Sequence, residues 1–496
     1  MKPTLARTLQ EIGDSIQRGD GKSAASRLKE IFLRRIPRNQ VAEVASLARR
    51  AGLIQISLRI LNPIVRPSGR KRLEASDVER VQYAAALNAV GAGEEALDIL
   101  RTIDKKRVPD ALLFKAFALI SQWNYEAAIP VLQQYALMSG PSHYQKLVAK
   151  VNLAAALVYE RQHQAASDLL KEILEISERD NLHLLRGNAL ELAAQNAILH
   201  QKWSEAKLFL ECSEKLLANT TGLSGLFVVQ KWKVFLEILS SPPGTSNLRL
   251  LESIRKEGTQ REQWEIIRAC DNLEAIREKN RELFTHLFFG TPFESFRKRL
   301  VTDFGKDVEV PDQYDWRIAG KPKPTQTFDL VSCEFGGRRV SLKAGQTLHL
   351  LLLAFAADFY RPQRLAGLHF RIYPNEYYNS ISSHNRVHTV IARLRHWFDT
   401  EKIPLAISEI SGQYRLEASE PIALRVYRKL ETTHTKHSLW AAKLKSQLTK
   451  ETFSIQDVLG KMDLPYRTAI RLLTGACEEG LILRFGTGRA TSYRFL

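Results

Sequence analysis

A group of polar residues in the C-terminal third has types and spacing suited to reading DNA. They are Asn385, Arg386, Thr389 and Arg393, with Arg395 toward the end of the same stretch. An arginine guanidinium can donate two hydrogen bonds to guanine, and an asparagine amide can pair in the same way with adenine in the major groove. These residues therefore predict a surface that contacts the base edges of double-stranded DNA.

Apolar residues in the same stretch predict the helix that would present this surface. They recur at i, i+4, i+7 and i+11 and share the opposite face: Val387, Ile391, Leu394 and Phe398. Ser382 or Ser383 can cap the start of the helix with its hydroxyl oxygen. A helix that is buried on one side and polar on the other can enter the major groove.

Strands and two further helices are predicted around this helix. Alternating residues flank a Gly-Gly dipeptide, which is typical of a tight hairpin. In chain order we predict a hairpin across Gly336-Gly337, helices over 345–358 and 362–369, a tyrosine-rich loop over 371–380, the polar-faced helix, and a hairpin across Ser411-Gly412.

This order of hairpin, three helices and hairpin resembles the OmpR/PhoB-type winged-helix DNA-binding domain. The resemblance is carried by Val340–Leu342, Leu350–Leu353, Arg386–Arg395 and Ile410–Leu416. In that family the third helix enters the major groove and the wing touches the adjacent backbone or minor groove. The resemblance thus implies groove contacts for the polar residues named above, and wing contacts for Ser411 and Gln413.

Two positions depart from the family pattern. The family usually has glycines on both sides of one wing residue, whereas here Ser411 and Gln413 flank Gly412. Ala392 occupies a slot that is often basic in the family, which removes one phosphate or base contact. A winged helix that contacts only protein remains the alternative.

A second, shorter unit of the same kind is predicted at the C-terminus. Ser454–Asp457 has the Ser-x-x-Asp form of a capping box. A further helix is predicted to start at Leu464-Pro465 and to end at Gly480, with Ala469, Leu473 and Ala476 inward and Arg467, Thr468, Arg471 and Thr474 outward. Strands over 481–484 and 491–495 would flank a turn that holds Arg489.

The unit is similar to small winged-helix domains of bacterial regulators, which implies DNA contacts for Arg467, Arg471 and Arg489. A module that only dimerises or packs is the alternative.

The first part of the chain shows a repeat in which a small residue is followed by leucine four positions later. The pairs are Ala24/Leu28, Ser57/Leu61, Ala96/Leu100, Ala128/Leu132, Ala166/Leu170 and Ala206/Leu210. Another small residue recurs twelve positions earlier, at Ala45, Ala84, Ala116, Ala154 and Ala194, with Ile12 in that slot of the first unit. Small side chains at these positions allow two antiparallel helices to approach closely.

The repeat resembles the tetratricopeptide family over about residues 10–255, with Pro109 and Pro141 near the positions where the family closes a repeat. Its units are longer than the usual family length of about 34 residues. Stacked helix pairs create a concave surface, so the resemblance implies a protein or peptide partner. A generic α-helical bundle is the alternative.

Charge and composition point to a polyanionic partner. The net charge is +18, and residues 321–496 carry 26 Lys/Arg against 15 Asp/Glu. No apolar run is long enough to span a membrane, and no signal peptide precedes the first repeat, so we expect a cytoplasmic protein.

No motif for catalysis, a cofactor or a metal is found in the sequence. It contains neither a Walker-type phosphate loop nor a Gly-x-Gly-x-x-Gly after a strand. The four cysteines are isolated, and His384 and His388 lack a nearby third metal ligand. We expect neither an enzyme nor a cofactor or metal site.

The expected fold is mainly α, a tetratricopeptide-like solenoid followed by two winged-helix (α+β) domains. The predicted domains are the repeats over 1–304, a linker over 305–327, the OmpR/PhoB-type unit over 328–420, a connector helix over 421–452, and the second winged helix over 453–496. The predicted function is sequence-specific transcriptional regulation through double-stranded DNA. The alternative is a repeat scaffold or adaptor whose winged helices contact proteins, and a homodimer is open in both cases.

Overall fold

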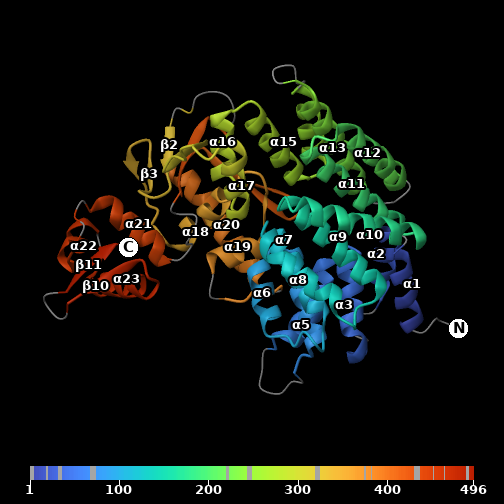
Figure 1. The fold of residues 1–496 in the computed structure, drawn as a ribbon. Helices are drawn as coiled ribbons and strands as arrows, with labels where there is room; N and C mark the ends of the chain where they lie inside the picture. Colours follow the sequence, from blue (N-terminus) through green and yellow to red (C-terminus); the bar gives the residue numbers. More distant parts are fainter. Residues whose placement is uncertain are drawn as a thin grey trace. The chain divides into compact units, whose positions relative to one another are not determined.

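The computed structural model describes most of the chain. It covers 5–17, 20–31, 36–67, 74–218, 223–242, 248–318, 324, 326–373, 376–380, 382–428, 436–448, 450, 452–462, 464–486 and 491–495. Within these residues the fold is mainly α, with a helical-repeat array followed along the chain by a mixed region of helices and small sheets (Figure 1). No described helix is long and apolar enough to cross a membrane.

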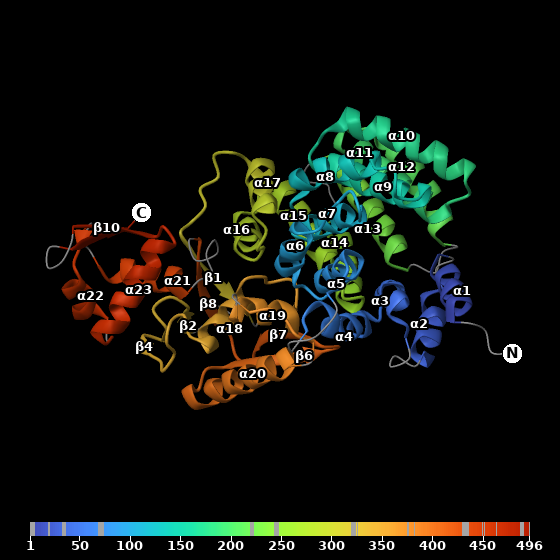
Figure 2. The ribbon, with the colours of Figure 1, turned by 90° about the horizontal axis from the view of Figure 1, so that it is seen from below.

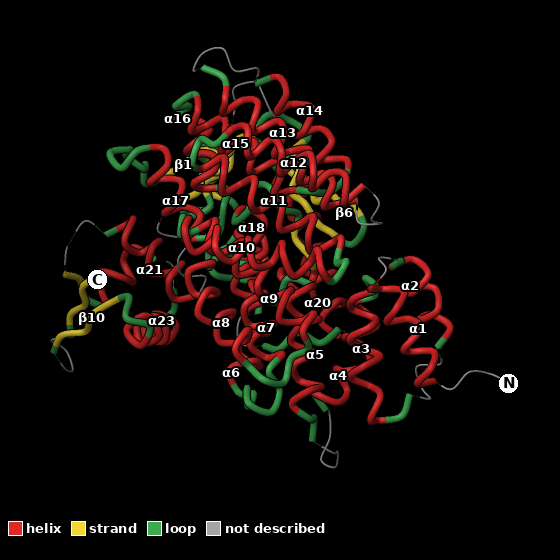
Figure 3. The backbone as a smooth tube through the Cα atoms, turned by 45° about the vertical axis from the view of Figure 1, so that its right-hand side comes forward, coloured by secondary structure: helices red, strands yellow, loops and turns green. Residues whose placement is uncertain are grey.

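Two compact units divide the chain. The first holds Met1–Glu278, Phe293–Arg299 and Asn379–Ile381, and the second holds Lys279–Pro292, Leu300–Tyr378 and Ser382–Leu496. In the tube view the described part of the first unit is drawn as helices and loops, and the described strands all belong to the second (Figure 3).

The first unit is a succession of antiparallel helix pairs. The helices are α1 (Leu5–Gln17), α2 (Gly21–Glu30), η2 (Arg38–Gln40), α3 (Val41–Arg50), α4 (Ile54–Val65), α5 (Asp77–Ala89), α6 (Gly93–Arg101), α7 (Asp110–Ser121), α8 (Tyr125–Leu137), α9 (His143–Tyr159), α10 (His163–Arg179), α11 (His183–Leu199), α12 (Trp203–Ala218), α13 (Leu223–Ser240), α14 (Arg249–Gln260) and α15 (Trp264–Arg277). Every predicted small residue and leucine of the repeat is buried in this array. The structure therefore has the arrangement expected of tetratricopeptide-like repeats.

The helices of a pair are joined by a tight turn that closes with the same two hydrogen bonds in six of the described pairs. After α7, the Trp123 N–H donates to the carbonyl of Ile120 and the Asn124 N–H donates to that of Leu119. The corresponding bonds recur after α3, α5, α9, α11 and α14, and they form a Schellman motif. The residue in the left-handed region is Gly52 or Gly91 in two turns, but it is Trp123, Arg161, Gln201 and Glu262 in the others.

The helices after the repeats do not all belong to the first unit, although the sequence predicts one repeat domain over 1–304. α16 (Arg281–Phe289) belongs to the second unit, where Phe289 is buried in the same core as Trp316. Only Phe293–Arg299, at the start of α17 (Glu294–Phe304), belongs to the first unit. There Phe296 contacts Trp123 at 5.1 Å between ring centroids, so only the start of α17 packs on the repeats.

The segment predicted as a linker contains a strand. β1 (Gln313–Arg317) pairs antiparallel with β8 (Ile422–Tyr427), which lies where a connector helix was predicted. Both predictions are wrong at these strands, because burial of Trp316 and pairing with a distant strand of the same module stabilise β1. The five-stranded sheet has the order β1-β8-β2-β3-β4, with β2 (Gln326–Asp329), β3 (Glu334–Phe335) and β4 (Arg338–Arg339).

Three helices follow in the first C-terminal module, which we define as residues 313–428. They are α18 (Thr347–Ala356), α19 (Leu365–Ile372) and α20 (Ser382–Glu401). The helix predicted over 362–369 begins only at Leu365, because Gln363–Arg364 forms β5 and pairs with β7. β6 (Leu405–Ile410) and β7 (Gln413–Ala418) form the predicted hairpin (Figure 2). The order of the sheet is β5-β7-β6.

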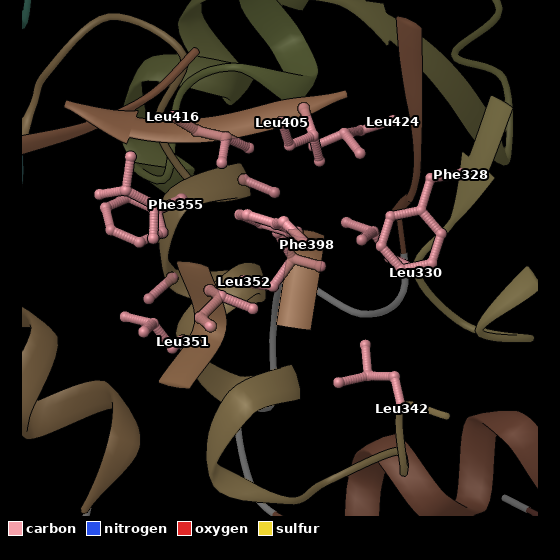
Figure 4. Close-up of a cluster of buried hydrophobic side chains, with 14 of the residues drawn as sticks. Phe328, Leu330, Leu342, Leu351, Leu352, Phe355, Phe398, Leu405, Leu416 and Leu424 are labelled. Carbon is pink, nitrogen blue, oxygen red and sulfur yellow. The ribbon is translucent and has the colours of Figure 1, made fainter. Parts of the chain in front are cut away.

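The core of this module joins the helices to both sheets. In the close-up, Phe398 of α20 lies beside Leu352 of α18, with Leu405 and Leu416 of the hairpin above them (Figure 4). Phe328 and Leu330 close the other side of this cluster. Burial of these side chains fixes α20 with its polar face outward.

The second C-terminal module, defined as residues 436–495, has a core of its own. Its elements are α21 (Lys436–Gln447), β9 (Thr452–Phe453), α22 (Ile455–Lys461), α23 (Tyr466–Glu478), β10 (Ile482–Phe485) and β11 (Ser492–Phe495), with sheet order β10-β11-β9. Ser454 caps α22 in the predicted capping box with Asp457. Ala469, Leu473 and Ala476 of α23 are fully buried, as predicted.

Candidate nucleic-acid interface

α20 separates its residues onto two faces as its sequence predicts. Val387, Ile391, Leu394 and Phe398 are buried, while Asn385, Arg386, Thr389, Arg393 and Arg395 are exposed. The structure brings the first four polar candidates together on one face of a single helix. Their side chains nevertheless differ in how far they are already engaged within the protein.

Arg386 is held by the loop that precedes α20. Both terminal nitrogens of its guanidinium donate to the Glu376 carboxylate, with Nη2 at 3.1 Å from Oε1. The guanidinium also lies over the Tyr373 ring, 4.0 Å from the centroid. The hydrogen bond to Glu376 raises the pKa of Arg386, and the same bond lowers the pKa of Glu376. Nothing in the spacing of the sequence indicated this partner.

Arg395 serves the hairpin in this structure. Its Nε and Nη2 donate to the carbonyl of Ile407 at 3.2 and 2.7 Å. This pair of bonds ties α20 to strand β6, next to the predicted wing. Arg395 is therefore a positioning residue for the hairpin in the observed arrangement, which its place in the sequence did not indicate.

Arg393 and Asn385 are the least engaged of the candidates. Within the described part of the chain, neither the Arg393 guanidinium nor the Asn385 amide has a hydrogen-bond or ion-pair partner. The Thr389 hydroxyl donates to the Asn385 carbonyl one turn earlier, at 2.8 Å, and its oxygen can still accept a bond. A guanidinium and an amide on one helical face are thus open to a ligand.

The predicted wing ends in a two-residue turn. Ser411 and Gly412 both have positive φ, 53° and 74°, as a type I′ turn requires. Ser411 is exposed and Gln413 is half-buried, while Ile410 is 64% exposed beside them. The tip is short and carries an apolar side chain among its polar ones.

The two histidines weighed as metal ligands are engaged with tyrosines. His384 Nε2 lies 2.5 Å from the Tyr378 hydroxyl, and His388 Nδ1 lies 3.4 Å from that of Tyr414. No cluster of three or more His, Cys, Asp or Glu side chains that could hold a metal is found among the described residues.

α23 of the second module presents a simpler basic face. Arg467 and Arg471 are one turn apart and exposed, and neither has a hydrogen-bond or ion-pair partner among the residues that the structure covers. Tyr466 is 56% exposed at the start of the helix. Thr468, predicted to be exposed, is half-buried, and Arg489 lies outside the described residues.

Two exposed arginines of the hairpin that follows α23 were missed in the sequence. Arg484 of β10 and Arg494 of β11 are exposed, and Arg494 lies 5.6 Å from the centroid of Phe485. The alternation of Arg494 with buried Tyr493 was a signal that could have identified it, whereas Arg484 lies on the same strand face as buried Ile482 and has no such signal. Leu483 and Phe485 are exposed on the same hairpin, so the surface is both basic and apolar.

Comparison with known proteins adds little to this geometry. No protein-family model and no curated protein matches the chain. One similar solved structure is that of the apo form of RapI, at 13% sequence identity and a TM-score of 0.32. The similarity covers 57% of this chain and 85% of RapI. A TM-score this low does not establish a shared fold, so the helical-repeat architecture rests on the helix pairs and turns of this chain.

Proposed function

We propose that the protein is a sequence-specific DNA-binding transcriptional regulator of the cytoplasm. The observation that supports this most strongly is the duplication of one arrangement. α20 and α23 are each buried on one side in a core of their own module. Each exposes arginine that lacks a partner among the described residues, Arg393 on α20 and Arg467 and Arg471 on α23. In both modules a two-stranded hairpin follows the helix directly, as in a winged helix.

In this proposal the two helices contact the major groove and the hairpins contact the adjacent backbone. Asn385, Arg386, Thr389 and Arg393 are the groove residues of the first module, with Ser411 and Gln413 on its hairpin. Arg467 and Arg471 lie on the corresponding helix of the second module, where their guanidinium groups contact phosphates. The helical repeats bind a protein or peptide partner, or a second copy of the chain, on the surface that their stacking creates. The proposal includes no catalytic step and no cofactor.

The proposal is tested by the binding of the full chain to duplex DNA as the salt concentration rises. About six phosphate contacts would lower the affinity by several orders of magnitude between about 50 and 200 mM salt. Selection from random-sequence DNA should also enrich a common site. Affinity that stays flat across this range, or selection without any enriched site, would overturn the proposal.

A repeat scaffold whose C-terminal modules contact proteins is the second candidate. It is favoured by the exposed apolar side chains of the second module, Tyr466, Leu483 and Phe485, because apolar surface is more typical of protein interfaces than of phosphate contacts. Replacing the three by serine would leave salt-dependent DNA binding intact if they serve a protein partner. Loss of DNA binding in that variant would count against the scaffold.

A further inference from the structure

The contact between Arg386 and Glu376 places a carboxylate beside the proposed groove face. A backbone hydrogen bond holds Glu376 there, because its N–H donates to the Tyr373 carbonyl at 3.0 Å. The Tyr373 ring then lies against the guanidinium of Arg386 while the carboxylate takes its two terminal nitrogens. Two side chains that precede α20 thus hold one guanidinium of the helix in a defined orientation.

Arg386 keeps donors for a ligand in this arrangement. A guanidinium has five N–H groups, and the carboxylate takes two of them. At least two remain even where the Tyr373 hydroxyl accepts a third. Guanine requires two donors at its O6 and N7 atoms. The contact with Glu376 is therefore compatible with base reading by Arg386.

The contact with Glu376 disfavours binding of a DNA phosphate by Arg386. Glu376 already neutralises the charge of Arg386, and its own charge repels a phosphate group. The side chains of Arg386 and Glu376 are 44% and 48% exposed, so their pair lies in water and salt can screen it. The carboxylate is thus a mild obstacle to phosphate binding that acts equally on every DNA sequence.

We propose that Glu376 is a specificity-determining residue of the first module. It withholds Arg386 from the DNA backbone, which all sequences share, and orients it toward guanine, which only the correct site supplies. The inference rests on the proposed function, because it assigns a role within DNA binding. It differs from that proposal in giving an acidic residue of the loop a part in sequence selection.

The test compares Glu376→Gln with the parent in the full chain. The probes are a duplex that the parent selects from random-sequence DNA and a duplex of the same composition in shuffled order. Glu376→Gln should tighten binding to the shuffled duplex up to about fivefold, and steepen its salt dependence by about 0.9 in log–log slope. Affinity for the selected duplex should change less, so the ratio of the two affinities falls.

Two controls separate this effect from a general gain of positive charge. Glu420→Gln removes one charge from an exposed glutamate that has no partner among the described residues, and it should leave the ratio unchanged. The double variant Glu376→Gln/Arg386→Gln should lose the gain on shuffled DNA. Unchanged circular dichroism would show that the variants fold as the parent does.

The outcomes distinguish the inference from the proposed function. If the parent binds DNA and selects a site, but Glu376→Gln changes the ratio no more than Glu420→Gln, the inference alone is overturned. A gain that persists in the double variant overturns it as well. If the parent binds no duplex at low salt, the proposed function fails and the inference fails with it.

Discussion

The two C-terminal modules present arginines on one helix each, but they treat those arginines differently. In the first module Arg386 is paired with Glu376 and Arg395 is bonded to the Ile407 carbonyl, while Arg393 alone has no partner among the described residues. In the second module Arg467 and Arg471 have no partner within the described residues. A restrained guanidinium is suited to orientation and base selection, whereas a free one is suited to phosphate contact with any sequence. Under the proposed function, the first module selects the site and the second strengthens binding.

The cores of the modules differ in a related way. The first module takes Phe289 of α16 into its core, from a helix that lies before β1 in the chain. The core of the second module is formed by residues from Trp440 to Tyr493. Both modules therefore depend on chain outside the boundaries that their sequence predicts, the first on α16 and the second on α21.

The largest expected effect tests that dependence with two fragments of the chain. A fragment over 279–496 keeps α16, and a fragment over 306–496 lacks it. Loss of α16 removes Phe289 from the core and should cost the first module about 3–5 kcal/mol. Urea unfolding of the two fragments, with hydrogen exchange in peptides of each module, measures this. The second module should be equally protected in both fragments, and equal protection of α20 in both would contradict the dependence.

Low pH should destabilise the first module more than the second, because the first contains a fully buried histidine. His349 of α18 is 1% exposed, accepts a bond from the Gly345 N–H, and donates to the Leu330 carbonyl at 2.6 Å. Burial, with a smaller effect of Lys443, lowers the pKa of His349 from 6.5 to about 4, so the folded state holds it neutral. Burial also lowers the pKa of His369 to about 4.

A lowered histidine pKa means that the unfolded chain binds the proton first as the pH falls. The stability of the first module should therefore be complete above pH 6.5 and decrease toward pH 4, by about 3 kcal/mol for His349. Hydrogen exchange at several pH values measures this, and His349→Gln should flatten the dependence. A second module that loses protection over the same range as steeply as the first would argue against the assignment.

The arginine faces should differ in the salt dependence of DNA binding. Arg467→Ala and Arg471→Ala should each reduce the log–log slope by about 0.9, because each removes an unpaired positive charge. Arg386→Ala should leave the slope nearly unchanged but cost roughly 1–3 kcal/mol on the selected site. Lys207→Ala, an exposed lysine of α12, is the matched control. Equal slopes for Arg386→Ala and Arg471→Ala would remove the distinction between the faces.

The smallest expected effect concerns the repeats. Deletion of residues 1–278 should leave DNA affinity within about tenfold of the parent, or roughly 1.4 kcal/mol, because the proposed DNA contacts lie in the second unit. The mass of both proteins in solution should be measured with the affinity, since lost dimerisation would also weaken binding. The deleted segment includes a basic stretch, in which Lys and Arg outnumber Asp and Glu over 1–80. A larger loss without a change in mass would therefore indicate that the deleted residues contact DNA directly.

Local patterns in the sequence were enough to predict each helix that carries the candidate site and the face that it buries. The helical period places Val387 and Phe398 in a core, and it does the same for Leu473 of α23. The Ser454–Asp457 capping box and the Ser411-Gly412 turn also form as predicted. Each of these features depends on residues within a few positions of one another, so the sequence alone determines them.

Only the tertiary structure decided which of the exposed side chains are already engaged. Arg386 is hydrogen-bonded to Glu376 of the preceding loop, and Arg395 is hydrogen-bonded to a carbonyl of the next strand. Both contacts depend on how α20 packs against the loop and the hairpin. The pairing of β1 with β8 joins the first and last strands of the module, which share no local signal. Trp123 has the left-handed conformation that a sequence would assign to glycine, and its ring contacts Tyr159 and Phe296 of other helices. Such contacts follow from where the chain returns in space, and no spacing along the chain encodes them.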